Sequence, residues 1–164
     1  MERHPGTKKV ETGQVNMFVL DASVVIKWFT QEELTAKSLE LRNNFVEGKI
    51  EIAVPDLLIY ELANALRYNP HFQRDDVEKA IDSLYNMGID IIVPLPGVMK
   101  SAIEMGFRYN ITVYDAAYPA LAQELGFTFV TADKAYSSLL LYRFLSDATR
   151  PARKMQAGMK TVSS

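Results

Sequence analysis

Four acidic residues are placed along the chain where an α/β fold would bring their carboxylates together. Asp21 follows the apolar run at residues 17–20, and Asp133 follows a second such run at residues 127–132. The other two, Glu61 and Asp115, fall in stretches with helical character. Clustered carboxylates repel one another, and a bound divalent cation offsets that repulsion. The pattern therefore indicates a metal-dependent enzyme.

The elements expected to position these residues alternate along the chain. Strands are expected at residues 17–20, 50–54, 90–93 and 127–131, with 139–144 as a candidate for a last one. Helices are expected at residues 23–29, 34–47, 55–68, 75–88, 98–109 and 112–125. Strands that alternate with helices indicate a mainly parallel sheet with helices on both faces. Ligands bind at the carboxyl ends of the strands in such sheets.

Two prolines bear on the helix boundaries. Pro55 is expected to open a helix, because the first turn is where proline is favoured. Pro119 falls inside the last expected helix, where a proline costs ~3 kcal/mol. We therefore expect that helix to begin as late as Asp115 or to bend at Tyr118.

All four carboxylates can reach one edge of this sheet. Asp21 and Asp133 each follow a strand, and Asp115 opens the helix that leads into the last of these strands. Glu61 lies roughly two turns into its helix, and its Cβ tilts back towards the helix N-terminus. The carboxyl edge of the sheet is thus the predicted site.

Hard oxygen ligands of this kind suit Mg²⁺ or Mn²⁺. Water bound to such a metal can attack a phosphodiester while the metal stabilises the developing charge. Three polar side chains are candidates for supporting roles: Ser23 near Asp21, Thr131 near Asp133, and Asn64 at i+3 from Glu61 on one helix face.

Taken singly, each acidic residue has a simpler explanation. Asp21 and Asp115 suit helix caps, Glu61 suits a solvated or ion-paired helix position, and Asp133 suits a cap of the segment after it. Capping or polar packing likewise explains the three supporting residues. Tyr114, Tyr118 and Trp28 are expected in the core or at its rim. Independent capping would not require all four acids to share one edge, so the combination carries the hypothesis.

Composition narrows the functional classes. The chain has no cysteine and two histidines far apart, which excludes thiolate chemistry and disfavours a Ser-His-Asp triad. No apolar run reaches the ~20 residues of a membrane span, and residues 1–16 lack the apolar stretch of a signal peptide. We expect a cytoplasmic protein that does not enter a membrane.

Charge divides the chain into three parts. The net charge of −2 comprises +1 in residues 1–16, −6 in residues 17–145 and +3 in residues 146–164. We expect a flexible N-terminal extension at 1–16, one domain at 17–145, and a flexible basic tail at 146–164. Met17 is a candidate alternative start.

Three stretches together resemble the signatures of the PIN-domain family: "FVLDASVVIKWF", "PDLLIYELANALR" and "TVYDAAYPALAQELGFTFVTADKAY". The resemblance spans roughly residues 17–144 and is strongest to the small VapC-type toxins. It implies a three-layer α/β/α sandwich and a Mg²⁺- or Mn²⁺-dependent ribonuclease that acts on RNA. It also implies a homodimer and a cognate antitoxin that binds near the active site.

By position, the four acids match the acidic quartet of that family: Asp21, Glu61, Asp115 and Asp133. Ser23, Asn64 and Thr131 match its polar neighbours, and Pro119 departs from its usual helix. Other hypotheses stay open: a PIN-like module that binds RNA or protein with little catalysis, and cleavage of DNA. A phospho-acceptor receiver domain needs an adjacent acidic pair after the first strand, whereas this chain has only Asp21 there.

Overall fold

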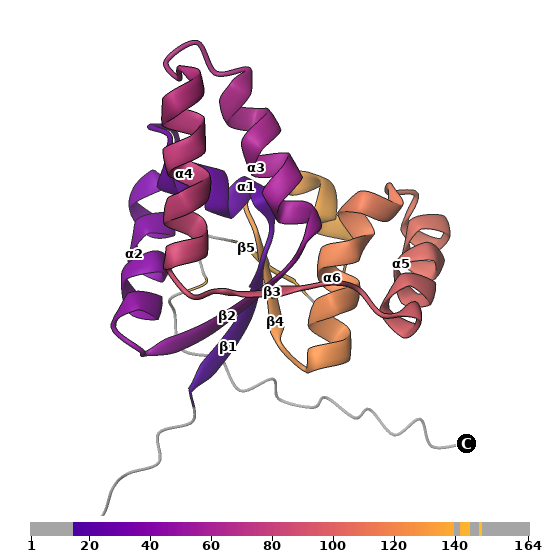
Figure 1. Ribbon diagram of the computed structural model, residues 1–164. Helices are drawn as coiled ribbons and strands as arrows, with labels where there is room; N and C mark the ends of the chain where they lie inside the picture. The colour runs from indigo at the N-terminus through magenta and orange to yellow at the C-terminus, as the bar shows by residue number, and fades with distance from the viewer. Residues whose placement is uncertain (1–14, 140–141, 145–147, 149–164) are drawn as a thin grey trace, which may run out of the picture.

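The computed structural model describes residues 15–139, 142–144 and 148. Within these residues the fold centres on a five-stranded sheet in which every pairing is parallel, in the order β3-β2-β1-β4-β5. The strands are β1 (Asn16–Leu20), β2 (Ile50–Pro55), β3 (Asp90–Ile92), β4 (Thr128–Thr131) and β5 (Tyr142–Phe144). Their carboxyl ends point the same way, towards α1 (Figure 1).

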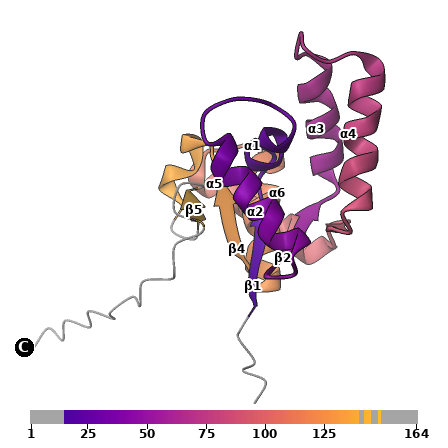
Figure 2. The ribbon, with the colours of Figure 1, turned by 90° about the vertical axis from the view of Figure 1, so that its left-hand side faces the viewer.

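Helices cover both faces of the sheet, which makes three layers and confirms the expected α/β/α sandwich (Figures 1 and 2). Beside α2 (Thr35–Val46) on one face lie α1 (Ala22–Val25) and the 3₁₀ turn η1 (Ile26–Trp28). On the other face, α6 (Val113–Leu125) contacts β1, β2 and β4, and α5 (Pro96–Tyr109) packs on α6. A hairpin of α3 (Leu57–Arg67) and α4 (Arg74–Asn86) projects beyond the carboxyl edge (Figure 1). The 3₁₀ turn η2 (Lys134–Ser138) follows β4.

The sequence pattern explains why the sheet is buried. Strand β1 ends in the fully buried pair Val19 and Leu20, and the last residues of β2 and β4 are buried as well. Parallel strands covered on both faces are expected to be apolar throughout. Helix α6 is alanine-rich and buried from Ala116 to Ala122, so its backbone can approach three strands closely. The polar residues that follow the strands are therefore left at the sheet edge.

The structure corrects two expectations about prolines. Pro55 ends β2 instead of opening a helix, and α3 begins at Leu57 with Asp56 as its N-cap residue. The α6 helix begins at Val113, not as late as Asp115, and it continues through Pro119. A bend at Tyr118 stays a prediction. Thr112 caps α6, because its hydroxyl accepts a hydrogen bond from the Asp115 N–H.

Among the described residues, no helix combines the length and apolarity that a membrane span requires. Strand β5 falls within the candidate region at 139–144, although residues 140 and 141 lie outside the described part. Residues 1–14 and 149–164, which make up most of the expected extension and tail, also lie outside it. At the N-terminal boundary, β1 begins at Asn16, one residue before the expected start.

Candidate active site

Asp21 is buried at the carboxyl end of β1. The residue is 6% exposed, and its main-chain N–H donates to the Val130 carbonyl at 2.9 Å, which joins the ends of β1 and β4. Asp21 occupies the N-cap position of α1 but makes no side-chain capping bond. Capping therefore does not explain why a carboxylate is buried here.

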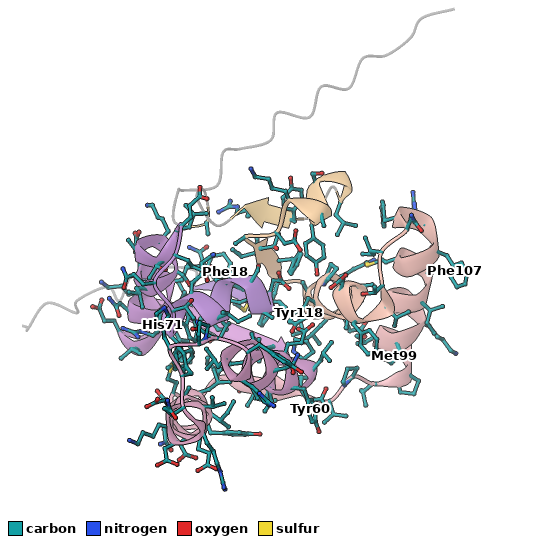
Figure 3. The ribbon with its side chains drawn as sticks, turned by 90° about the horizontal axis from the view of Figure 1, so that it is seen from above. Phe18, Tyr60, His71, Met99, Phe107 and Tyr118 are labelled. Atoms are coloured by element: carbon teal, nitrogen blue, oxygen red, sulfur yellow. The ribbon has the colours of Figure 1, made fainter. Side chains whose placement is uncertain are left out.

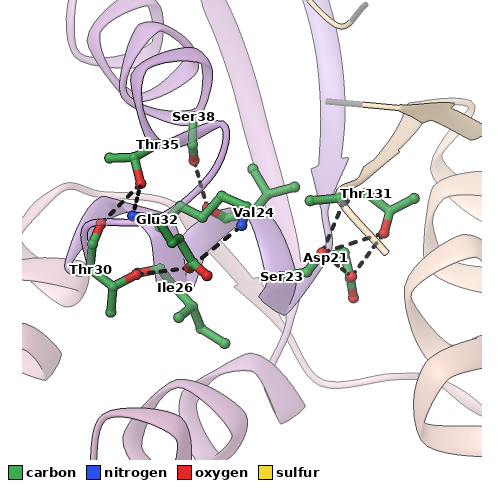
Figure 4. Close-up of polar contacts among 11 residues, drawn as sticks. Asp21, Ser23, Val24, Ile26, Thr30, Glu32, Thr35, Ser38 and Thr131 are labelled. Carbon is green, nitrogen blue, oxygen red and sulfur yellow. Dashed lines mark hydrogen bonds and ion pairs between the residues drawn. The ribbon is translucent and has the colours of Figure 1, made fainter. Parts of the chain in front are cut away.

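Two hydroxyl groups hold the Asp21 carboxylate from one side (Figure 4). Ser23 Oγ donates to Asp21 Oδ2 at 2.5 Å, and Thr131 Oγ1 donates to the same oxygen at 3.0 Å. Each hydroxyl in turn accepts a main-chain N–H at 3.0 Å, from Ala132 to Ser23 and from Asp133 to Thr131. These hydrogen bonds fix the Asp21 side chain and link it, through Thr131, to the main chain of Asp133.

Asp133 lies where the chain leaves β4, and its own side chain is exposed. Its Oδ1 accepts a hydrogen bond from the Ala135 N–H at 2.8 Å, so it caps η2 as the simpler interpretation predicted. A capping carboxylate uses one oxygen for this bond and keeps lone pairs for other partners. Capping and a role in the site are therefore compatible for Asp133.

Asp115 lies in the first turn of α6, where the partial positive charge of the helix N-terminus favours a carboxylate. Pro119, four residues later, has no N–H to give to the Asp115 carbonyl. The Tyr136 hydroxyl donates to that carbonyl at 3.1 Å instead. The Tyr136 ring is held edge-on against Phe129 of β4, with 5.1 Å between ring centroids. The proline in α6 is thus compensated by a tyrosine from η2.

Glu61 reaches the site from α3. It is half-buried, and one of its oxygens, Oε2, accepts a hydrogen bond from the hydroxyl of Tyr118. Tyr118 is fully buried in α6, three residues after Asp115. Burial and the bond to Glu61 raise the pKa of Tyr118 far above neutral pH, so its hydroxyl stays protonated and acts as the donor.

The four carboxylates influence one another's pKa or that of Tyr136. Burial raises the pKa of Asp21, and the charge of Asp133 raises it further. The hydrogen bonds from Ser23 and Thr131 lower it in part. Burial also raises the pKa of Glu61, which the Tyr118 bond opposes and the charges of Asp21 and Asp115 reinforce. Burial, and then all four carboxylates, raise the pKa of Tyr136. All four predicted carboxylates thus act on one group, the Tyr136 hydroxyl.

No ion pair within the described part of the chain involves any of these four carboxylates. A buried acid without a cationic partner is costly unless it is protonated or binds a cation. The donors are all carboxylate and hydroxyl oxygens, which suit a hard divalent ion. Among the described residues, no group of three or more acidic or histidine side chains is placed so that it could hold a metal ion without rearrangement. The donor set fits an open site where water and substrate complete the coordination, as Mg²⁺ prefers.

The structure does not bring Asn64 into this cluster. Asn64 is exposed and lines a groove between α3 and α4 together with Tyr60, Arg67 and Phe72. Within the described residues, no hydrogen bond joins its side chain to a site carboxylate. Asn64, three residues after Glu61 on α3, faces α4 and not the carboxylates.

Two tyrosines contact the site that sequence reasoning did not assign to it. The sequence predicts Tyr118 in the core or at its rim and gives no indication of a role for Tyr136. The position of Tyr118 at i+3 from Asp115 was a usable signal, since such residues share a helix face. Nothing in the local sequence indicates the contact of Tyr136, because it joins elements through the Asp115 backbone.

Comparison with known proteins identifies the family to which the chain belongs. A family model described as the PIN domain matches residues 18–139. This chain belongs to the PIN-domain family. The matched residues contain all four carboxylates and both tyrosines, so the site described above lies within the PIN domain.

Individual relatives agree with this assignment. The chain is 29% identical over 120 residues to Ribonuclease VapC3 from Pyrobaculum aerophilum, covering 71% of this chain and 88% of the relative. A toxin–antitoxin complex from Klebsiella pneumoniae contains a similar fold, with a TM-score of 0.60, 13% identity, and 77% and 96% of the two chains covered. VapBC2 from Rickettsia felis, bound to a DNA fragment from their promoter, gives a TM-score of 0.59 at 13% identity, covering 78% and 96%. The two solved structures support the fold.

Proposed function

We propose that this PIN domain is a metal-dependent endoribonuclease and the toxin of a toxin–antitoxin pair. The observation that carries the proposal is the Asp21 carboxylate, which is buried at the sheet edge without a cationic partner among the described residues and is linked through Thr131 to Asp133. The similarity to Ribonuclease VapC3 supports RNA as the substrate, and the toxin–antitoxin complexes of the same fold support the partner. The reaction is hydrolysis of an RNA phosphodiester.

Mg²⁺ or Mn²⁺ is the proposed cofactor, and the four carboxylates are its proposed ligands. When bound, the metal supplies an activated water and stabilises the charge that develops on the phosphate. Asp21 presents a carboxylate that is already fixed, because Ser23 and Thr131 both hold its Oδ2. Asp115 lies at the N-terminus of α6, whose partial charge favours anions. Asp21 therefore needs little rearrangement to bind a cation.

The proposed antitoxin contact is the groove between α3 and α4. It is lined by Tyr60, Ala63, Asn64, Arg67, Phe72 and Val77 among others, which combine apolar rings with a cationic side chain. The groove lies on α3, the helix that also carries Glu61, so a protein segment bound there would contact an element of the proposed site. Co-expression with the product of a neighbouring reading frame tests this contact, since a cognate antitoxin should co-purify and suppress cleavage.

A homodimer is proposed through the outer face of α5. The exposed apolar residues Leu95, Ile103 and Phe107 lie at and along this helix, and Val93 precedes it. An exposed apolar face of this kind commonly marks an interaction site.

We further propose that residues 17–145 form the nuclease domain, flanked by an extension and a basic tail, and that the protein acts in the cytoplasm, where its RNA substrate is found.

Sequencing of cellular RNA ends tests the proposed function directly. Induction of the wild type should arrest growth and create new RNA ends at defined sites, whereas Asp115→Asn should do neither while accumulating to the same level. Asp82→Asn, at an exposed position on α4, serves as the matched control and should behave as the wild type. Unchanged RNA ends on wild-type induction would favour a PIN-fold binding module without catalysis.

A further inference from the structure

The hydroxyl of Tyr118 donates a hydrogen bond to the carboxylate of Glu61, the one site residue that comes from α3. Asp21 is held by two hydroxyl groups and Asp133 by a main-chain N–H, while Asp115 sits on a capped helix turn. Glu61 has the longest side chain of the four and comes from α3, outside the β1, β4 and α6 group. Within the described residues, the Tyr118 hydroxyl supplies the one hydrogen bond that its carboxylate receives.

Because Tyr118 is buried, its hydroxyl has no water to replace Glu61 as a hydrogen-bond partner. The residue is 0% exposed, and its ring lies in the middle of the molecule when the structure is viewed from above (Figure 3). A buried tyrosine hydroxyl needs a partner, and leaving it without one is costly. Tyr118 therefore cannot release Glu61 without losing its own hydrogen bond. Because Tyr118 and Asp115 are three residues apart on α6, this helix supplies one carboxylate and orients another.

We propose that Tyr118 is a positioning residue that holds the Glu61 carboxylate towards Asp21 and Asp115, ready to bind a divalent cation. This rests on the proposed function, because it takes Glu61 as a metal ligand. Residues that orient metal ligands by hydrogen bonds typically change metal affinity 10- to 100-fold when they are mutated. The expected gain arises because the Glu61 side chain is ordered before the metal arrives.

Titration of the purified full chain with Mn²⁺ by calorimetry tests the role of Tyr118. Tyr118→Phe keeps the ring and removes the hydroxyl, so Mn²⁺ affinity should fall about tenfold or more. Tyr85→Phe removes a hydroxyl from α4, where Tyr85 is 57% exposed, and should leave the affinity unchanged. Thermal unfolding in EDTA confirms that each variant is folded at the titration temperature. Tyr118→Met also lacks the hydroxyl and replaces Tyr118→Phe should that variant not fold.

The same titration in a Glu61→Ala background separates positioning from a general structural effect. Once the carboxylate is gone, removing the Tyr118 hydroxyl should cause no further loss of Mn²⁺ affinity. Equal losses in both backgrounds, or wild-type affinity in Tyr118→Phe, would overturn the inference and leave the proposed function intact. Wild-type affinity in Glu61→Ala would instead remove Glu61 from the ligand set and overturn both the inference and that part of the proposed site.

Discussion

Asp21 is the residue whose charge conflicts most with its surroundings. It lies at the end of a strand whose last three residues are buried, and burial raises the pKa of its carboxyl. The hydroxyls of Ser23 and Thr131 reduce the cost of the charge without removing it. Such a site lowers the stability of the metal-free protein and makes it able to bind a cation.

The raised pKa of Asp21 predicts how stability depends on pH. The folded state holds the Asp21 proton more tightly than the unfolded state does. The ionised form is therefore disfavoured in the fold, and stability falls as pH rises from the ordinary value of 3.8 through the raised pKa. In EDTA, Asp21→Asn should therefore be more stable than the wild type at neutral pH, and the difference should shrink as pH falls towards 4. Urea unfolding at a series of pH values measures this. A variant less stable than the wild type at pH 7 would contradict it.

Added Mn²⁺ should reverse the order of stability. Mn²⁺ at 100 times its dissociation constant stabilises the folded wild type by ~2.7 kcal/mol, because it binds only the folded state. Asp21→Asn has lost a proposed ligand and should gain much less. Unfolding midpoints with and without Mn²⁺ test this prediction, and an equal gain in both proteins would exclude Asp21 as a ligand.

Helix α6 connects most of the site. It carries Asp115 and Tyr118, and the main-chain carbonyl of Asp115 accepts a hydrogen bond from the Tyr136 hydroxyl. Pro119 creates the need for that last bond, since it removes the N–H that would normally donate there. The proline therefore makes a contact between α6 and η2 necessary, and η2 directly follows Asp133.

A double-mutant cycle tests this account of Pro119. Tyr136→Phe should cost about 1–3 kcal/mol of stability, because the Asp115 carbonyl loses its donor. In a Pro119→Ala background the cost should be smaller, because the introduced alanine carries an N–H for that carbonyl. Denaturant unfolding of the four proteins gives the coupling energy. A cost of Tyr136→Phe that is the same in both backgrounds would show that Pro119 and Tyr136 are independent.

Local patterns predict the elements well and the contacts between them less well. Apolar runs predicted the strands, and the positions of Asp21, Asp115 and Asp133 at element ends followed from those runs. Pro55 was misplaced because a proline suits both the end of a strand and the start of a helix. Asn64 was predicted from helix spacing alone, which does not say which neighbour a face meets. Tyr136 acts through a backbone carbonyl, and that bond depends on tertiary packing.

At the scale of the whole molecule, the outer face of α5 is left without a partner among the described elements. Phe107 is 88% exposed there, and Leu95 and Ile103 extend the same apolar surface. Burying such residues against a second copy would remove apolar area from water, which favours association. The proposed homodimer uses this face.

Phe107→Glu should disrupt the proposed dimer, because it places a charge in the apolar contact. Sedimentation velocity should show a dimer for the wild type and a monomer for Phe107→Glu at the same concentration. Val46→Glu is the matched control, since Val46 is 68% exposed on α2 at a distance in sequence and fold from α5. A Phe107→Glu protein that remains dimeric would place the interface elsewhere.

The proposal that four carboxylates form the catalytic metal site is tested most directly by RNA cleavage with the purified protein. The rate on a single-stranded RNA should depend on added Mg²⁺ or Mn²⁺ and be abolished by EDTA. Asp115→Asn should reduce it by at least about 10²-fold, since the metal's contribution to phosphodiester chemistry is several kcal/mol. Asp82→Asn should cleave as the wild type does. Cleavage by folded Asp115→Asn at the wild-type rate, or a rate unaffected by EDTA, would contradict the account.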